Sequence, residues 1–524
     1  MRISIFFEKK DNYKAIKELT YFIGNTGSEL QNKNREDIDI AAFSYNDAKY
    51  IRKEIQVNNE ELYNIYIYLI VFEKNKEDLK MLLNKVENIL ESSGLIPRRA
   101  YFREEQLFKA CMPIMENSID IKNAARRNIL TNGIVATYPF ISSTIFDKDG
   151  IFIGSNMDNE SLIFINKFDN KKYKNANMCV FGTSGAGKSY FIKLQVLRNR
   201  LSDINQYIID PEREYIKIVK HLNGINIKLG PNSNTFINIF DIREESLEDG
   251  EGYLINKISK LIGFFSLIFE NIDEEEKGLL EEKIIECYKR KGINFNDKSL
   301  YKIVNNKKRF KESKDMPILN DFYNLLTKDE KLKKLSNKLI PFIEGSMKFL
   351  NNYTNVELNN KLIVGDIYEL GEDNIKYGMY IFIEIFWDKI KKDRKSKKII
   401  YMDEIWRLIG VTSNKHVASF IYKMFKTIRK YGGSTVGITQ DISDIFSLEK
   451  GIYGKSILNN SNIKVYFNLE EENILTLSKF ANLSEKEKLE IKSLKRGECL
   501  MIVNDNHILS KIEAAEFEKE ILNE

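Results

Sequence analysis

The residues best suited to chemistry are eight consecutive ones that fit the pattern G-x-x-x-x-G-K-[ST]. Glycines at the first and sixth positions let the backbone curl, so that successive N–H groups and a helix N-terminus converge on phosphate oxygens. The lysine would bridge the β- and γ-phosphates of ATP, and the last hydroxyl would ligate Mg²⁺. A strand expected at 177–181 and a helix starting near Tyr190 flank the pattern, which argues against a glycine-rich turn that binds nothing. The expected binding residues are Gly182, Thr183, Ser184, Gly185, Ala186, Gly187, Lys188 and Ser189, with Ser189 also a metal ligand.

A second acidic strand would complete this site. In "KKIIYMDE" (397–404), four apolar residues carry Asp403 and Glu404 to the carboxyl end of a strand, where open α/β sheets place their ligands. Asp403 would hold the metal, directly or through water, and Glu404 would polarise the attacking water. The pair therefore indicates hydrolysis rather than nucleotide binding alone; the alternative is a solvated strand end.

Two further polar residues are suited to roles in an ATP-driven motor. Gln440 follows the apolar strand 434–439, from which it could reach the γ-phosphate and report its loss. Arg429 lies 11 residues earlier in "KTIRKYGG", near a helix end, where it could stabilise transition-state charge on a neighbouring subunit's nucleotide. Both residues can equally be read as solvated surface from spacing alone.

Two charged segments have open interpretations. Asp210-Pro211-Glu212 follows the strand 206–211, so its carboxylates could position a water, a metal or an arginine, or Asp210 could cap a helix that starts near Pro211. Six of the eight residues at 391–398 are Lys or Arg. They form either a solvated helix end or a contact for acidic lipid, DNA or a partner.

The elements that position these residues are short apolar strands, most of them followed by a helix. Such strands are typical of a parallel sheet covered on both faces, which predicts an α/β fold. Between about 245 and 355 no such strand appears, and we expect a helical insertion there. The strands are expected at 177–181, 206–211, 361–367, 397–404, 434–440 and 462–468.

The first 150 residues have a different pattern, in which strand-like and helical stretches are mixed. An apolar, β-branched stretch at 64–72 predicts a strand, and the helical spacing of leucines at 76–94 predicts a helix. A further helical stretch is expected to end in "RNIL" (127–130). We expect an α+β domain at 1–150 and the nucleotide-binding domain at 151–524.

Composition excludes several classes of protein. Hydrophobic residues make up 43% of the 524 residues, which excludes a disordered chain, and a net charge of +5 gives no sign of DNA binding. Four isolated cysteines and three scattered histidines argue against a zinc site and a disulfide framework. The longest apolar runs, 65–72 and 261–269, are less than half of the ~20 residues that a membrane span needs. We expect a protein that is cytoplasmic or peripheral to a membrane.

Several segments together resemble the TraC/TrbE/CagE-type ATPases of conjugative type IV secretion systems, the VirB fourth component. The resemblance covers most of the chain from about residue 40, and Arg429 and Gln440 match the family's arginine and glutamine motifs in position. Members often have a longer N-terminal region, so part of the first domain is expected to be missing or reduced. The segments are "FGTSGAGKSYFIKLQVLRNR", "YIIDPEREY", "KLGPNSNTFINIFDI", "IIYMDEIWRLI" and "IRKYGGSTVGITQD", with further likeness in "IPRRAYFREEQLFKACMP" and "LKRGECLMIV".

The resemblance implies a RecA-like, ATP-hydrolysing motor of the HerA/FtsK kind, hexameric or passing through dimers, at the cytoplasmic face of the inner membrane. It would energise pilus or channel assembly and substrate transfer, with the membrane channel and the coupling protein as partners. The alternative is a DNA translocase or coupling protein with the same core, but acidic runs such as 270–276 balance the basic residues, and no membrane span is present. A regulator without turnover is disfavoured by the pair Asp403 and Glu404.

Overall fold

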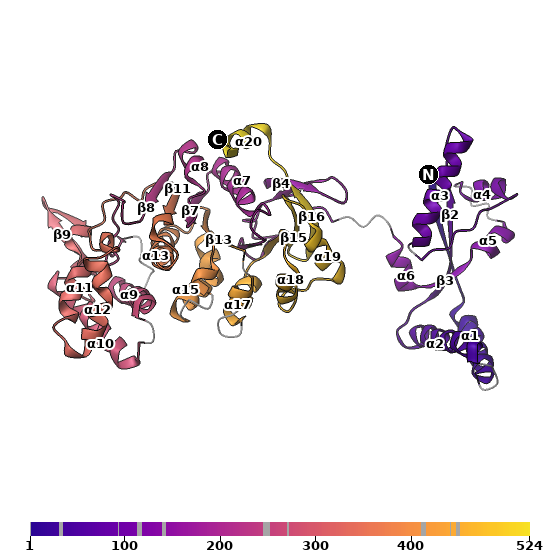
Figure 1. Cartoon of the computed structure of the whole chain (residues 1–524), viewed down its shortest axis with the longest axis horizontal. Coiled ribbons are helices and arrows are strands. Elements are labelled where there is room, and N and C mark those ends of the chain that lie inside the picture. The colour runs from indigo at the N-terminus through magenta and orange to yellow at the C-terminus, as the bar shows by residue number, and fades with distance from the viewer. Residues whose placement is uncertain are drawn as a thin grey trace. The chain divides into compact units, whose positions relative to one another are not determined.

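The computed structural model describes residues 2–30, 35–92, 94–112, 118–138, 143–244, 252–269, 272–409, 415–440, 442–446 and 451–523 (Figure 1). It divides into two compact units, Met1–Ile141 and Ser142–Glu524, slightly before the boundary expected at residue 150. All the residues predicted to bind or hydrolyse the nucleotide lie in the second unit.

The described part of the first unit has an antiparallel sheet in the order β1-β2-β3, together with six helices. The predicted strand and helix are present as β2 (Leu62–Ile70) and α3 (Lys76–Ser92). The prediction of helix up to residue 130 is wrong: Arg127–Leu130 is β3, whose backbone pairs with Leu62–Ile65 of β2. The other elements are β1 (Arg2–Lys9), α1 (Asn12–Glu29), α2 (Arg35–Val57), α4 (Glu104–Ala110), α5 (Ile119–Ala125) and α6 (Thr131–Ala136).

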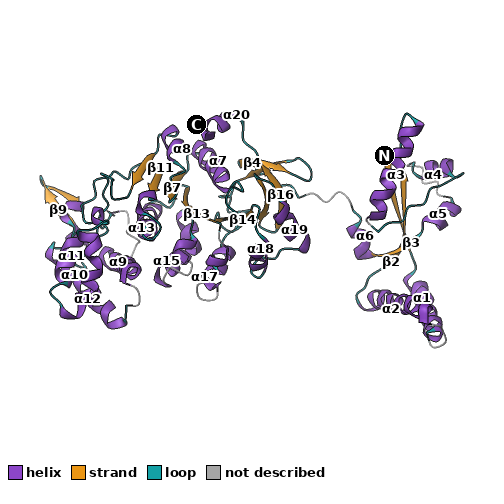
Figure 2. Cartoon of the chain, in the orientation of Figure 1, coloured by secondary structure: helices purple, strands orange, loops and turns teal. Residues whose placement is uncertain are grey.

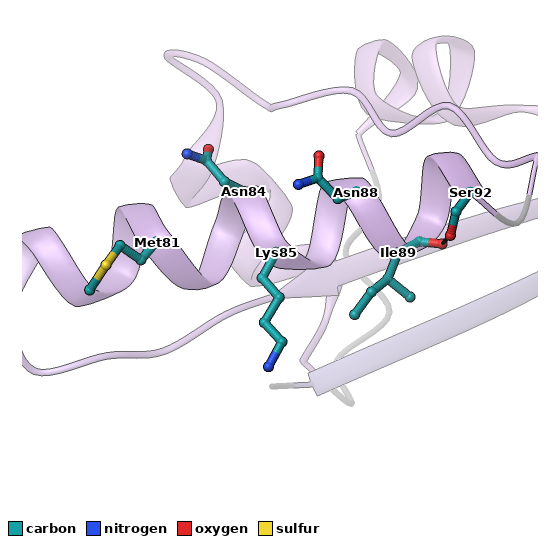
Figure 3. A pocket seen from close by; sticks show the side chains of 6 residues that line it. All are labelled: Met81, Asn84, Lys85, Asn88, Ile89 and Ser92. Atoms are coloured by element: carbon teal, nitrogen blue, oxygen red, sulfur yellow. Dashed lines mark hydrogen bonds between the residues drawn. The ribbon is translucent and has the colours of Figure 1, made fainter.

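A shallow pocket lies along the outer face of α3 (Figure 3). Met81 and Ile89 in this face are 65% and 55% exposed, and no residue of α3 is buried. Asparagine, lysine and serine side chains make up the rest of the lining, without any carboxylate or glycine-rich loop. The pocket therefore lacks the glycine-rich loop and the carboxylates that the nucleotide chemistry needs.

The second unit is built on an 11-stranded sheet in the order β5-β4-β16-β15-β14-β6-β13-β12-β7-β11-β8 (Figure 2). Every neighbouring pair from β14 to β8 is parallel, and β15, β16, β4 and β5 continue the sheet antiparallel. The predicted α/β class is confirmed, and all six expected strands are present. They are β6 (Met178–Phe181), β7 (Asn205–Asp210), β11 (Leu362–Asp366), β12 (Lys398–Met402), β13 (Gly433–Thr439) and β14 (Ile463–Tyr466); the others are β4 (Ile151–Asn156), β5 (Leu162–Ile165), β8 (Ile225–Lys228), β15 (Glu498–Val503) and β16 (Asn506–Ile512).

Helices cover both faces of this sheet, and successive strand residues enter two separate cores. In β12, Ile400 and Met402 pack into one core while Ile399 and Tyr401 pack into the other. This alternation is what a strand buried on both faces requires. One core includes residues of α9 (Tyr253–Phe269), α13 (Ile375–Lys392), α15 (Lys415–Thr427), α17 (Ile452–Asn459) and α18 (Glu471–Ser478), and the other includes residues of α7 (Lys188–Leu201) and α8 (Ile216–His221), with α20 (Glu516–Asn523) packed against it. Short helices α14 (Trp406–Ile409), α16 (Ile442–Ile445) and α19 (Glu485–Ser493) complete the unit.

In the segment expected to be a helical insertion, the described residues form helices and one β-hairpin. Its helices are α9, α10 (Glu274–Arg290), α11 (Leu319–Leu326) and α12 (Lys333–Ile343). Between α10 and α11, β9 (Tyr301–Val304) pairs with β10 (Lys307–Phe310). Asn305 and Asn306 join them with φ angles of 51° and 58°, the left-handed conformation of a two-residue hairpin turn. Among the described helices of the whole chain, none has the length and apolar character needed to cross a membrane.

Candidate functional site

The predicted phosphate-binding loop connects β6 to α7 at the carboxyl edge of the parallel strands. Gly185 and Gly187 have φ angles of +77° and +111°, which L side chains rarely adopt. A Cβ on Gly187 would also lie 3.2 Å from the backbone nitrogen of Gly497. Within the described residues, no backbone carbonyl accepts from the N–H groups of Ser184, Gly185 and Gly187. The loop therefore presents donors of the kind that phosphate oxygens accept from.

Lys188, at the first position of α7, is 8% exposed and points back into the loop. Its Nζ donates to the carbonyl oxygens of Gly182 and Thr183 at 2.7 and 2.9 Å. Burial lowers the pKa of Lys188, and the carboxylates of Asp403 and Glu404 oppose this shift. The ammonium is thus held within the loop that is expected to receive phosphates.

Asp403 and Glu404 follow β12 at the same sheet edge, and they are only 7% and 5% exposed. Burial, then the charge of Glu404, raises the pKa of Asp403 well above its usual range, and burial also raises the pKa of Glu404. Glu404 has a φ angle of 50°, its N–H donates to Asp403 Oδ1 at 3.0 Å, and its carboxylate accepts from the Trp406 indole N–H. Buried carboxylates beside a strained backbone position are typical of a functional site.

The segment after β7 adds carboxylates to this edge. Asp210 accepts from the backbone N–H groups of Glu214 and Tyr215, both at 3.0 Å, and burial raises its pKa to about 6. The carboxylate therefore orders the turn that leads into α8, which begins at Ile216 and not at Pro211. Glu212 is exposed, and its charge raises the pKa of both Asp403 and Glu404, which puts it at the rim of the site.

Gln440 and Arg429 lie at opposite edges of the sheet. Gln440 directly follows β13, whose Thr439 pairs with Phe181, the residue before the loop. Arg429 precedes β13 and donates to the carbonyl of Lys174, which precedes β6, at 3.3 Å. The seven residues of β13 span about 20 Å, so Arg429 is far from the loop of its own chain.

The basic run at 391–398 is only partly solvated. Lys398 is buried, and its Nζ donates to the backbone carbonyls of Ser396 and Tyr431 at 3.0 and 3.2 Å and to that of Asp393. Lys391 is also buried, in the last turn of α13. Arg394, Lys395 and Lys397 are exposed. Within this run, the buried Lys398 holds the backbone of the turn in place, and the exposed cations present positive charge to solvent.

The sequence analysis did not identify the residues whose backbone hydrogen bonds hold the loop in place. The Thr183 N–H donates to the carbonyl of Asn468 at 2.9 Å, and the Gly497 N–H donates to that of Ala186 at 3.1 Å. Asn468 is the polar residue that ends the predicted strand 462–468, which was the available signal. Gly497, with a φ angle of +83°, lies in "LKRGECLMIV" and had no signal of its own.

These groups fit a magnesium–nucleotide complex. Within the described residues, no three His, Cys, Asp or Glu side chains gather into a metal-binding cluster. Magnesium is commonly held by one or two protein oxygens together with substrate phosphates, and Ser189 and Asp403 could supply such oxygens. The unpartnered N–H groups of the loop match the phosphates themselves.

Comparison with known proteins gives consistent results. The profile of the TraG P-loop domain matches residues 161–510. The chain is 21% identical to protein TraC of Escherichia coli (strain K12) over 431 residues, which are 79% of this chain and 46% of TraC. It thus spans about half the length of that relative. The structure of VirB4 of Thermoanaerobacter pseudethanolicus aligns with a TM-score of 0.65 and 29% identity over 72% of this chain and 100% of that one.

Proposed function

Since the chain belongs to the family of TraG P-loop domains, we propose that it is the ATP-hydrolysing motor of a conjugative type IV secretion system. One observation carries the proposal: the loop 182–189 and the buried pair Asp403 and Glu404 lie at one edge of one parallel sheet. The similarity to TraC and to VirB4 supports the setting in conjugation. The motor would energise channel or pilus assembly and transfer of DNA or protein.

Each residue at this edge has a separate task in the proposed reaction. The loop N–H groups and Lys188 would bind the phosphates of ATP, and Ser189 and Asp403 would hold Mg²⁺. The metal would neutralise phosphate charge when bound. Glu404 would accept the proton of the attacking water, and its contact with Trp406 fixes its orientation. Gln440, at the end of β13, would respond to the γ-phosphate.

Arg429 would act on the nucleotide of a neighbouring copy. Its place at the opposite sheet edge argues against a role at its own loop and supports an arginine finger supplied by another subunit. The active assembly would then be a homo-oligomer, a dimer or hexamer, in which each site uses two chains. We propose that it associates with the cytoplasmic face of the membrane beside the channel and coupling protein.

ATP hydrolysis by the purified chain tests the proposal. We expect Mg²⁺-dependent phosphate release that is lost with Lys188→Ala, and loss of conjugative transfer from a donor that carries this variant. The near-neutral net charge of +5 predicts little stimulation by DNA. Strong stimulation that falls steeply with salt would favour the alternative, a DNA translocase or coupling protein, and absence of hydrolysis would contradict both.

A further inference from the structure

The two edges of the parallel sheet carry opposite charges. At the carboxyl edge, Glu212 and Glu214 follow β7, and Asp403 and Glu404 follow the neighbouring parallel strand β12. The charges of all four act on Lys188, and we call these four the carboxylate rim. At the opposite edge, residues 393–397 connect α13 to β12 and present Arg394, Lys395 and Lys397, which we call the cationic turn. Within the described chain, none of these three cations forms an ion pair with a carboxylate.

The cationic turn is continuous with the surface around Arg429. The Lys398 N–H donates to the carbonyl of Gly432 at 3.2 Å, and the Arg394 guanidinium lies 5.5 Å from the ring centroid of Tyr431. A Cβ on Gly432 would lie 2.9 Å from the carbonyl oxygen of Ser396, so the two segments are in close contact. The cationic turn and Arg429 therefore lie on neighbouring parts of one surface.

The only acid within the turn is already engaged. The Asp393 carboxylate accepts from the backbone N–H groups of Lys395 and Ser396 at 2.8 and 3.1 Å. These bonds hold the turn in shape and direct the carboxylate toward its own backbone. The side chains of Arg394, Lys395 and Lys397 therefore present positive charge in a fixed loop.

The carboxylate rim carries an excess of negative charge. Glu214 has one cationic neighbour, Lys193 at 3.3 Å, and Glu212 is exposed without any ion pair in the described residues. Asp403 and Glu404 are buried within the site, so the surface charge of this edge comes from the exposed Glu212 and the partly exposed Glu214. A bound nucleotide would add further negative charge. A surface of this kind favours a cationic partner.

We infer that the cationic turn of one copy docks on the carboxylate rim of a second copy, so that the sheets associate head to tail. The inference rests on the proposed role of Arg429 in a neighbouring site and identifies further residues of that interface. Arg429 would face the nucleotide while Arg394, Lys395 and Lys397 face Glu212 and its neighbours. Because two different surfaces meet, the contact is heterologous and repeats around a ring or along a filament.

Charge reversal tests this contact without any need for hydrolysis. Self-association is measured by sedimentation velocity with Mg²⁺ and a non-hydrolysable ATP analogue at low and high salt. We expect Lys395→Glu and Glu212→Lys each to weaken association at least about tenfold, and the double variant to recover most of the loss. Lys455→Glu, an exposed lysine on α17, should leave association unchanged.

Unchanged association in both single variants, or a double variant without recovery, would overturn the inference. So would loss of binding to single-stranded DNA or to anionic vesicles in Lys395→Glu when its self-association is intact. Absence of hydrolysis in a wild type that associates as expected would instead contradict only the proposed function.

Cross-linking gives a second, independent readout. All four native cysteines are buried, so cysteines introduced at exposed positions react selectively. A mixture of Lys395→Cys and Glu212→Cys proteins should form an intermolecular disulfide dimer under mild oxidation, whereas Lys455→Cys mixed with Glu212→Cys should not. Equal yields from the two mixtures would contradict head-to-tail docking.

Discussion

At the scale of single residues, the site combines one buried lysine with two buried carboxylates, and these residues have separable tasks. Lys188 contacts the loop that we propose receives the phosphates, whereas Glu404 follows β12 and its carboxylate accepts from the Trp406 indole N–H. Binding and hydrolysis should therefore respond differently to substitution of each residue.

For Lys188→Ala, we expect ATP hydrolysis to fall by at least about 10²-fold, because the charge that stabilises the phosphates in the transition state is lost. Nucleotide affinity should fall as well. Phosphate release and titration with a fluorescent nucleotide measure the two effects. Lys217→Ala, an exposed lysine on α8, is the matched control, and wild-type turnover in Lys188→Ala would exclude the assigned role.

Glu404→Gln should separate the two effects. The amide keeps the size of the side chain but cannot accept a proton from water, so turnover should fall about 10²–10⁴-fold while ATP binding persists. Glu372→Gln, an exposed glutamate with 87% side-chain exposure, should hydrolyse normally. A Glu404→Gln protein that turns over at the wild-type rate would show that another group activates the water.

At the scale of elements, α7 is fixed to the C-terminal segment of the chain. Arg198 of α7 donates to the Glu518 carboxylate of α20 at 2.7 and 2.6 Å, and also to the carbonyls of Phe152 and Glu513 at 2.7 and 2.6 Å. Both side chains of the ion pair are 6% exposed. The helix that follows the proposed phosphate-binding loop is thus anchored by a buried, hydrogen-bonded ion pair.

Breaking this pair should destabilise the second unit. Arg198→Met leaves the Glu518 carboxylate buried without its partner, and we expect a loss of roughly 3–5 kcal/mol in the free energy of unfolding. Arg198→Met combined with Glu518→Gln should lose less, because no uncompensated charge remains. Urea denaturation measures both variants, with the more exposed pair of Arg200 and Asp203 as control.

The same pair predicts a pH dependence. Burial opposes ionisation of Glu518, but the hydrogen bonds from Arg198 and from the Ala515 N–H outweigh it and lower the pKa of the carboxyl. A lowered pKa in the folded state contributes stability above the pKa of the unfolded chain, and this stability is lost as the pH falls through the folded value. Below about pH 4, wild type and double variant should therefore converge in stability. A constant difference between them down to pH 3 would contradict this account.

Much of the fold was predictable because its signals are local. Each of the six predicted strands is a short apolar run, and the loop 182–189 is a contiguous pattern between a strand and a helix. The hairpin within the insertion was missed because β9 and β10 have only four residues each, although Asn305 and Asn306 marked its turn. The strand at 127–130 was missed because its pairing partner lies far away in the sequence.

At the scale of the whole molecule, the sheet order decides which residues meet, and the sequence did not reveal it. β6 lies between β13 and β14, which begin about 250 and 280 residues after it. That order brings Asn468 and Gly497 next to the loop. Arg429 lies at the opposite edge because it precedes β13, whereas the loop follows the neighbouring parallel strand β6. From sequence spacing alone, Arg429 could be either an arginine finger or a solvated surface residue.

The central claim is that each ATP site is composed of two chains, and a mixing experiment tests it most directly. Arg429→Ala should hydrolyse ATP about 10³-fold more slowly than wild type, since an arginine supplied in trans contributes about that much. Lys188→Ala should be slower by at least about 10²-fold, as argued above. In mixtures, some interfaces pair an intact loop with an intact arginine, so phosphate release should recover to a measurable fraction of the wild-type rate. Wild-type turnover by Arg429→Ala alone, or no recovery on mixing despite demonstrated subunit exchange, would contradict the claim.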